Sequence, residues 1–242
     1  MYGSTWSRSA GACDPWSLKA PATGDADPGV IRCGMAARLR SGALLAGGAL
    51  LVGWLLFSWF ERQMLYYPDP DLYTTPEREG MAFEDVRITT EDGVSLHAWF
   101  IPAKVAGDRR AIVVCHGNAG NIADRVPFAR LLHEGVGGHV LLFDYRGYGR
   151  SDGQPSEAGL YADGVAAVAA LRARPEVDPA KVVVFGRSLG GGVAAELGRR
   201  DPELAGVVLE STFTSIPEMA GRVFPLPGIG ALVQSQYDNL SK

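Results

Sequence analysis

The sequence is poor in cysteine and has no Lys/Arg-rich run, and both features limit what the chain can do. Its three cysteines lie far apart, at positions 13, 33 and 115, without a CxxC motif or the regular spacing of a disulfide framework. No metal site is therefore predicted. Cys115 lies inside an apolar run and is expected to be a small buried residue. The formal net charge of −4, without a basic cluster, argues against a nucleic-acid-binding surface.

The front of the chain contains one long uncharged run. Residues 1–34 are rich in Gly, Ser, Ala, Pro and Asp without a sustained period, and we expect residues 1–40 to form a disordered segment. Residues 41–60 (SGALLAGGALLVGWLLFSWF) are long enough to cross a bilayer as a helix. We interpret them as a transmembrane signal anchor. A cleaved signal peptide and a buried core helix are the alternatives.

The charges around this run predict its orientation. Three arginines precede it and mostly acidic residues follow it (Arg32, Arg38, Arg40; Glu61, Arg62, Asp69, Asp71). Because Lys and Arg favour the cytoplasmic side, we expect a cytoplasmic N-terminus and an extracytoplasmic remainder. Met35 would make an ordinary start for a signal anchor. We therefore hypothesise that residues 1–34 come from an upstream start-site assignment, which a peptide from residues 1–31 would contradict.

After a Pro/Asp-rich linker at residues 61–80, the segment 81–242 alternates strand and helix patterns. Residues 83–90 and 94–102 show period-two alternation around a turn, which predicts a hairpin. Strands are predicted at 111–117, 139–147, 181–188 and 205–211, the first two of them buried, and helices at 122–135, 156–174 and 189–200. This alternation predicts an α/β fold with a mainly parallel sheet and helices on both faces. Ligands of such sheets bind at the carboxyl ends of the strands.

The motif Gly186-Arg187-Ser188-Leu189-Gly190 follows one of these strands and opens a helix. A lone GxSxG is a weak signal, but this strand-turn-helix setting is that of a nucleophile elbow. Side chains at Gly186 or Gly190 would be expected to collide with neighbouring backbone. The alternatives are a packing turn or a phosphate loop, and the GxxxxGK[ST] pattern of the latter is absent. We predict Ser188 to be a nucleophile.

A second motif, CHGNAGN (residues 115–121), ends the strand predicted at 111–117. An oxyanion hole takes its second backbone donor from this position, so we assign the donors to the amides of Leu189 and Asn118, with Ala119 as the alternative to Asn118. His116, followed by Gly117, is expected to orient the loop rather than to act as the base. The other histidines are expected to be structural or exposed (His97, His133, His139).

Together, HGNAGN, FDYRGYGRSDGQPSE and VVVFGRSLGG resemble the α/β-hydrolase superfamily, and within it the membrane-anchored serine hydrolases with a signal anchor. The resemblance covers residues 51–242. It implies an acyl-enzyme on Ser188, no metal or organic cofactor, and residues 144–147 lining the mouth of the site without joining the triad.

The family order is Ser, then Asp or Glu, then His, and every histidine here precedes Ser188. Glu210 is a candidate acid in a variant arrangement. We expect a sequence truncated before its last two strands, which would also leave residues 205–211 as an exposed, apolar sheet edge. The alternative is a genuine short protein that binds acyl ligands or partners without turnover.

These inferences give a membrane-anchored serine hydrolase acting on an ester, thioester or amide. Its partners would be a small acyl substrate, extending to a lipid or a peptide, and the membrane. The segment 224–230 (FPLPGIG) begins a cap over the site or forms a plain loop. Specificity depends on such cap and loop residues, so the motifs leave the substrate open.

Overall fold

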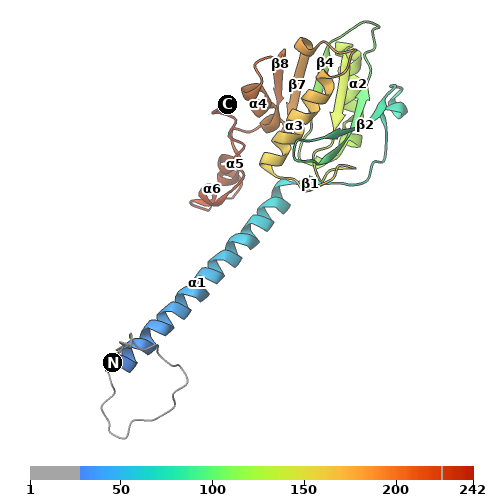
Figure 1. The fold of residues 1–242 in the computed structure, drawn as a ribbon. Coiled ribbons are helices and arrows are strands. Elements are labelled where there is room, and N and C mark those ends of the chain that lie inside the picture. Colours follow the sequence, from blue (N-terminus) through green and yellow to red (C-terminus); the bar gives the residue numbers. More distant parts are fainter. Residues whose placement is uncertain (1–27, 225) are drawn as a thin grey trace, which may run out of the picture. The chain divides into compact units, whose positions relative to one another are not determined.

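The structure, a computed structural model, describes residues 28–224 and 226–242, and it divides into two compact units. The units are Met1–Phe57 and Ser58–Lys242. The first described element, α1 (Pro28–Leu65), passes through the boundary between them (Figure 1). Within the described part of the chain, one stretch, Leu44–Leu65, is long and apolar enough to cross a membrane.

Helix α1 is longer than the sequence predicts at both ends. Residues 1–27 lie outside the described residues, but residues 28–40 are helical and do not form the disordered segment that we expected. Pro28 opens the helix because its fixed φ and missing N–H are tolerated in the first turn. Once a helix has formed, each added residue gains a hydrogen bond at little cost, so the helix extends beyond the apolar run. Its last five residues, 61–65, belong to the expected linker.

The second unit is built on a six-stranded sheet with the order β2-β3-β6-β4-β7-β8. The strands are β2 (Glu84–Thr89), β3 (Ser95–Ile101), β4 (Ala111–Cys115), β6 (His139–Phe143), β7 (Val182–Arg187) and β8 (Gly206–Glu210). Strands β2, β3 and β6 are antiparallel neighbours, and β6, β4, β7 and β8 run parallel. This confirms the predicted mainly parallel sheet that is entered through an antiparallel hairpin.

Helices cover both faces of the sheet (Figure 1). Helices α3 (Glu157–Arg172) and α4 (Leu189–Arg200) pack on one face, and α2 (Val126–Val136) packs on the other. Successive strand residues point to opposite faces, so β4 contributes Val113 and Cys115 to one core and Ile112 and Val114 to the other. Residues on both sides of β4 are buried, which explains its continuous apolar sequence.

Shorter elements complete the unit. They are β1 (Tyr67–Pro68), η1 (Pro76–Glu79), β5 (Ala119–Gly120), η2 (Ile122–Arg125), η3 (Pro179–Lys181), α5 (Ile216–Val223) and α6 (Ile229–Leu232). The helix predicted at residues 122–135 is divided into η2 and α2, because Pro127 near the start of α2 cannot donate to a preceding carbonyl. Strands β1 and β5 form a separate two-stranded parallel sheet.

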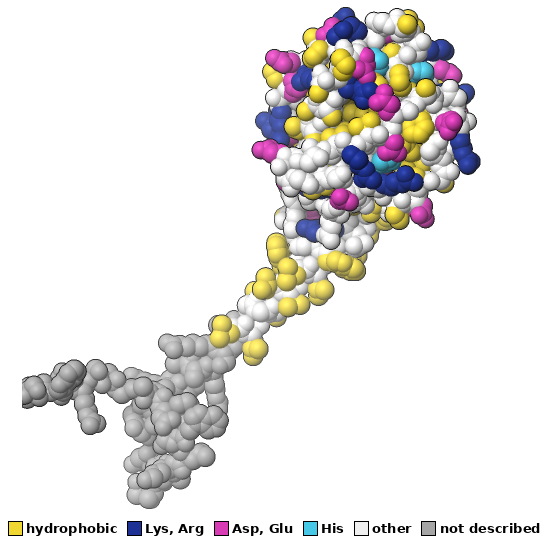
Figure 2. Space-filling model, turned by 45° about the vertical axis from the view of Figure 1, so that its right-hand side comes forward, with side chains coloured by type: hydrophobic (Ala, Val, Ile, Leu, Met, Phe, Trp, Pro, Cys, Tyr) yellow, Lys and Arg dark blue, Asp and Glu magenta, His cyan; other side chains and the backbone are white. Residues whose placement is uncertain are grey.

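The surface of the second unit carries charges of both signs. On the face shown in Figure 2, Lys/Arg and Asp/Glu side chains are interspersed. The described side chains of α1 differ, since Leu44, Leu50, Trp54 and Trp59 are all more than half exposed. At the sheet edge, β8 is the last strand within the described residues, and its Val208 is exposed as well.

Candidate active site

Ser188 occupies a strained turn between β7 and α4. Its backbone has φ 52° and ψ −117°, a conformation that L-residues rarely adopt and that costs of order 1–3 kcal/mol. Helix α4 begins at the next residue, Leu189. The first backbone N–H groups of a helix have no acceptor within the helix, so the amide of Leu189 is available as a donor. This is the geometry of a nucleophile elbow.

The glycines of the motif permit this turn because a β-carbon would not fit at either position. A β-carbon on Gly190 would lie 2.0 Å from the carbonyl oxygen of Cys115. One on Gly186 would lie 2.4 Å from the carbonyl oxygen of Gly190. Both clashes are with backbone atoms, so no side-chain rotation relieves them. The expected collisions at the two elbow glycines are present in the structure.

Both backbone polar groups of Ser188 are bonded to the end of β8 or to the residues just after it. The Ser188 amide donates to the carbonyl of Glu210 at 3.0 Å. The Ser188 carbonyl accepts from Gly191 N, at 2.9 Å, and from Thr212 Oγ1, also at 2.9 Å. The strained peptide is therefore fixed from two sides, and Thr212 is a contributor that the motifs did not reveal.

The HGNAGN loop (residues 116–121) lies beside the elbow. A β-carbon on Gly117 would be 3.7 Å from Cβ of Ser188, an ordinary van der Waals distance. The structure thus brings the loop that contains Asn118 and Ala119 next to the predicted nucleophile. At the far end of the loop, Gly120 has φ 75°, and a β-carbon there would collide with the carboxylate of Asp124.

The ring of His116 is buried beneath the loop, and of its two nitrogens only Nδ1 has a hydrogen-bond partner among the described residues. Its Nδ1 faces the carbonyl of Gly117 at 2.7 Å, and its Nε2 faces Asp144 Oδ1 at 3.8 Å. The ring packs against Tyr145, with 4.4 Å between ring centroids. Burial, the dominant effect, lowers the pKa of His116 to about 4, so the ring is neutral at neutral pH. These contacts suit the orienting role that we expected.

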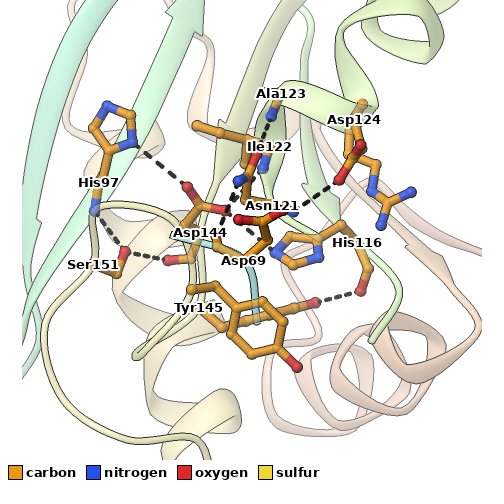
Figure 3. Close-up of polar contacts among 12 residues, drawn as sticks. Asp69, His97, His116, Asn121, Ile122, Ala123, Asp124, Asp144, Tyr145 and Ser151 are labelled. Atoms are coloured by element: carbon orange, nitrogen blue, oxygen red, sulfur yellow. Dashed lines mark hydrogen bonds and ion pairs between the residues drawn. The ribbon is translucent and has the colours of Figure 1, made fainter. Parts of the chain in front are cut away.

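Asp144 follows β6 and lies between two histidines, as Figure 3 shows. Its Oδ1 accepts from the backbone amide of Ile122 at 2.9 Å, and its Oδ2 lies 3.6 Å from His97 Nδ1. The Asp144 side chain is completely buried. Oδ2 and His97 Nδ1 have no hydrogen-bond partner among the described residues.

The residues around Asp144 are buried, which differs from the expectation that they line the mouth of the site. Tyr145 is inaccessible and donates from its hydroxyl to the carbonyl of His116 at 3.2 Å. Arg146 is 7% exposed and pairs with Asp163 and Asp92. The motif therefore supports the HGNAGN loop from below, because Tyr145 bonds to the carbonyl of His116 and Asp144 accepts from the amide of Ile122 just after the loop.

The remaining histidines are bound elsewhere. His97 Nε2 lies 3.1 Å from Asp85, and His133 Nε2 faces the carbonyl of Pro102 at 2.9 Å. His139 contacts the backbone of Ala103 and of Asp108 at 3.0 Å each. None of the four is hydrogen-bonded to Ser188 in the described part of the chain.

Glu210, the alternative acid, pairs with an arginine. Its Oε2 lies 3.5 Å from Nε of Arg187, its register partner on β7. Its contribution to the elbow is the backbone carbonyl described above. The segment 224–230 follows α5 and ends in the first turn of α6, and its Phe224 and Leu226 are exposed.

Asn121 is a buried polar residue that the motif analysis did not assign. Its Oδ1 accepts from Ala123 N and its backbone amide donates to Asp124 Oδ2, and the two bonds form a capping box. The pattern Asn-x-x-Asp before an apolar run is a known helix-start signal and could have identified it. Capping fixes where the HGNAGN loop ends.

The fold and the site can now be compared with known proteins. A family model described as serine aminopeptidase, S33, matches residues 106–238, just over half of the chain. The chain therefore belongs to this α/β-hydrolase family, whose members are esterase-like and peptidase-like hydrolases.

Similar proteins of known sequence agree with this assignment. The chain is 38% identical over 185 residues to the α/β-hydrolase domain-containing protein WAV2 of Arabidopsis thaliana, covering 74% of this chain and 60% of that protein. It is also 38% identical to an uncharacterized protein of Mycobacterium tuberculosis, covering 83% and 69% of the two chains. The protein bem46 of Schizosaccharomyces pombe is 37% identical, with 64% and 52% covered. The chain thus spans about 60% of the plant relative.

Solved structures show the same fold. The esterase Pf2001 of Pyrococcus furiosus superposes with a TM-score of 0.58 at 27% identity, covering 66% of this chain and 61% of the esterase. An α/β hydrolase of Vibrio vulnificus gives a TM-score of 0.56 at 22% identity, covering 67% and 59%, and supports the fold alone.

Proposed function

We propose that the protein is a serine hydrolase that cleaves an ester, thioester or amide through an acyl-enzyme on Ser188. The observation that carries the proposal is the strained backbone of Ser188 between two glycines that admit no side chain. A strained serine at a strand-helix turn exposes its hydroxyl for attack. The likeness to an archaeal esterase is consistent with this chemistry.

In the proposed reaction, Ser188 Oγ attacks the substrate carbonyl and forms a tetrahedral oxyanion. The amides of Leu189 and of Asn118, or of Ala119 in its place, donate to this oxyanion. Loss of one such donor typically costs 10²–10³ in kcat. Collapse of the intermediate expels an alcohol, thiol or amine, and water then releases the acyl group from Ser188.

The reaction needs a base for the Ser188 proton, because a serine hydroxyl is a weak nucleophile on its own. The four histidines of this chain are engaged with other groups, and the chain spans 60% of the plant relative. We therefore place the base, and the acid that orients it, in the part of the family's fold that this chain does not span.

We also propose that α1 anchors the hydrolase unit in a membrane as a single span. The stretch Leu44–Leu65 has the length and composition for this role. The arginines that precede it favour a cytoplasmic N-terminus and an extracytoplasmic hydrolase unit. The proposed partners are the membrane and a small acyl substrate.

A fluorophosphonate probe tests the enzyme proposal, since it reacts with activated serines. We expect the complete protein in membranes to be labelled and its Ser188→Ala variant not to be. Labelling that persists in the variant, or a folded complete protein that is never labelled, would contradict the proposal. The second result would favour a catalytically inactive binding module.

A further inference from the structure

The residues that follow the apolar part of α1 are bonded directly to the HGNAGN loop. We call residues 61–71 the juxtamembrane segment. The amide of Tyr67 donates to the carbonyl of Asn118 at 3.1 Å, and the amide of Asp69 donates to the carbonyl of Gly120 at 3.4 Å. These bonds form the small parallel sheet of β1 and β5. In addition, Asn118 Nδ2 donates to the carbonyl of Leu65 at 3.2 Å.

Asn121 adds a second connection between the segment and the loop. Its Nδ2 donates to the carbonyls of Asp69, at 3.0 Å, and of Asp71, at 2.8 Å. Asn121 is only 1% exposed, so these bonds do not compete with bulk water. The Asp69 carbonyl also accepts from the amide of Gly149, at 3.0 Å, which fixes the segment against the loop after β6.

Fixing a carbonyl also fixes the amide of the next residue, because the peptide group is planar and trans. The Asn118 carbonyl, which accepts from Tyr67 N and from Tyr148 Oη, therefore sets the direction of the Ala119 N–H. In the same way the Gly117 carbonyl, bonded to the ring of His116, sets the direction of the Asn118 N–H. The two candidate oxyanion donors of the loop are thus oriented by different groups.

The segment is itself held firmly at its other end. The carboxylate of Glu61 accepts from the amides of Gln234 and Ser235, at 3.0 and 2.7 Å. The hydroxyls of Tyr66 and Tyr237 lie 3.0 Å apart in a buried contact. These bonds make the juxtamembrane segment a fixed support for the loop, and the part of α1 from Ser58 onward belongs to the same compact unit.

We propose that the juxtamembrane segment is a positioning element of the oxyanion hole. The Tyr67 amide, bonded to the Asn118 carbonyl, and the Leu65 carbonyl, bonded to the Asn118 side chain, hold the peptide group between Asn118 and Ala119 so that the Ala119 N–H faces the substrate oxygen. This inference rests on the proposed function. In this proposal the end of the anchor helix does more than attach the hydrolase unit to the membrane. It also positions the loop that supplies an oxyanion donor, because residues 65–71 are hydrogen-bonded to residues 118–121.

The experiment compares Tyr67→Pro with Tyr67→Ala in the complete protein in membranes. Both variants lose the phenol ring, and only proline also removes the amide that donates to Asn118. Hydrolysis of a p-nitrophenyl ester should show a kcat at least tenfold lower in Tyr67→Pro than in Tyr67→Ala, with KM values within about threefold, as expected for a weakened oxyanion donor. Amide hydrogen exchange should be faster in residues 116–121 of Tyr67→Pro and equal in β7.

Equal kcat and equal loop exchange in the two variants would overturn the proposal. Hydrogen exchange needs no activity, so it tests the support of the loop even if Ser188→Ala shows the proposed function to be wrong. If Tyr67→Pro does not give a cooperative unfolding transition, Asn118→Ala replaces it. That variant keeps the backbone N–H groups of residues 118 and 119 but loses the side-chain bond to the Leu65 carbonyl. It should show the same selective loss of kcat and faster exchange in the loop, and wild-type values in both would overturn the proposal.

Discussion

Nε2 of His116 lies 3.8 Å from Oδ1 of Asp144, and both side chains are withdrawn from solvent. His116 Nδ1 donates to a carbonyl, so a neutral ring presents a lone pair at Nε2 toward a carboxylate. His97 Nδ1, on the other side of the carboxylate, also lacks a hydrogen-bond partner among the described residues. Asp144 is therefore an acceptor placed between two ring nitrogens beneath the HGNAGN loop.

Replacement of Asp144 should separate its hydrogen-bonding role from its charge. Asp144→Asn keeps the Oδ1 acceptor for Ile122 N and adds an N–H toward His97, so we expect a free energy of unfolding within about 1 kcal/mol of wild type. Asp144→Ala leaves the buried Ile122 amide without an acceptor and should lose about 1–3 kcal/mol. Urea unfolding measures both, and an Asn variant as unstable as the Ala variant would contradict this assignment.

The burial of His116 predicts a loss of stability in mild acid. Its pKa is about 4 in the folded protein, against about 6.5 in an unfolded chain. Between these values the unfolded state binds the proton and the folded state does not, so stability is complete above pH 6.5 and falls as the pH drops toward 4. The contribution is about 3 kcal/mol. Urea midpoints measured from pH 4.5 to 7.5 should have a smaller slope in His116→Gln; an unchanged slope would refute the prediction.

A methyl group at position 190 should disrupt the elbow. The β-carbon of Gly190→Ala would lie 2.0 Å from the Cys115 carbonyl oxygen, so the turn must move, at a cost of about 1–3 kcal/mol or more. Labelling of Ser188 by the fluorophosphonate probe should be lost when the turn moves. Gly206→Ala is the matched control, because a β-carbon there meets nothing within 4 Å and its stability should change by less than about 0.5 kcal/mol. Thermal unfolding and probe labelling check both variants.

The hydroxyl of Thr212 should matter for the shape of the elbow. Thr212→Val removes the donor to the Ser188 carbonyl at a cost of about 1 kcal/mol, and probe labelling should become several-fold slower. Thr214→Val serves as the control, since the Thr214 hydroxyl donates to Glu218 and not to the elbow. Comparable slowing in both variants would show that Thr212 has no specific role.

The outer strand β8 should promote self-association of this chain. Val208 and Leu209 are 47% and 45% exposed, and β8 pairs with no further strand on its outer side within residues 28–224 and 226–242. Val208→Lys should reduce light scattering at high protein concentration while leaving the unfolding midpoint nearly unchanged. Val207→Lys, at a position packed against the core, should instead destabilise the fold. Identical scattering of Val208→Lys and wild type would exclude the edge as the cause.

Sequence patterns were sufficient to predict the elements in which apolar residues recur at a regular spacing or in an unbroken run. The alternation at residues 83–102 predicted the hairpin of β2 and β3, and the apolar runs predicted the parallel strands. Ser156, the first residue of the helix predicted at 156–174, caps α3, since its hydroxyl accepts from Gly159 N. The role of Ser188 could be predicted because Gly186 and Gly190 flank it between an apolar strand pattern and a helical pattern.

The support of the site could not be predicted in the same way. Strands β1 and β5 have two residues each, one of them a proline, so they carry no periodicity. Their pairing joins positions more than fifty residues apart through backbone groups, which every sequence contains. Likewise, the carboxylates of Glu61 and Glu157 accept from four consecutive backbone amides at 234–237. Backbone amides occur at nearly every position, so the residue types at 234–237 do not indicate these bonds.

The glycines that follow Ser188 make room for side chains that come much later in the sequence. A β-carbon on Gly191 would collide with Thr212, and one on Gly192 would lie 2.6 Å from Tyr237. The ribosome makes Tyr237 about fifty residues after Ser188. The packing of α4 against Thr212 and Tyr237 is therefore completed only after the chain beyond β8 has been made.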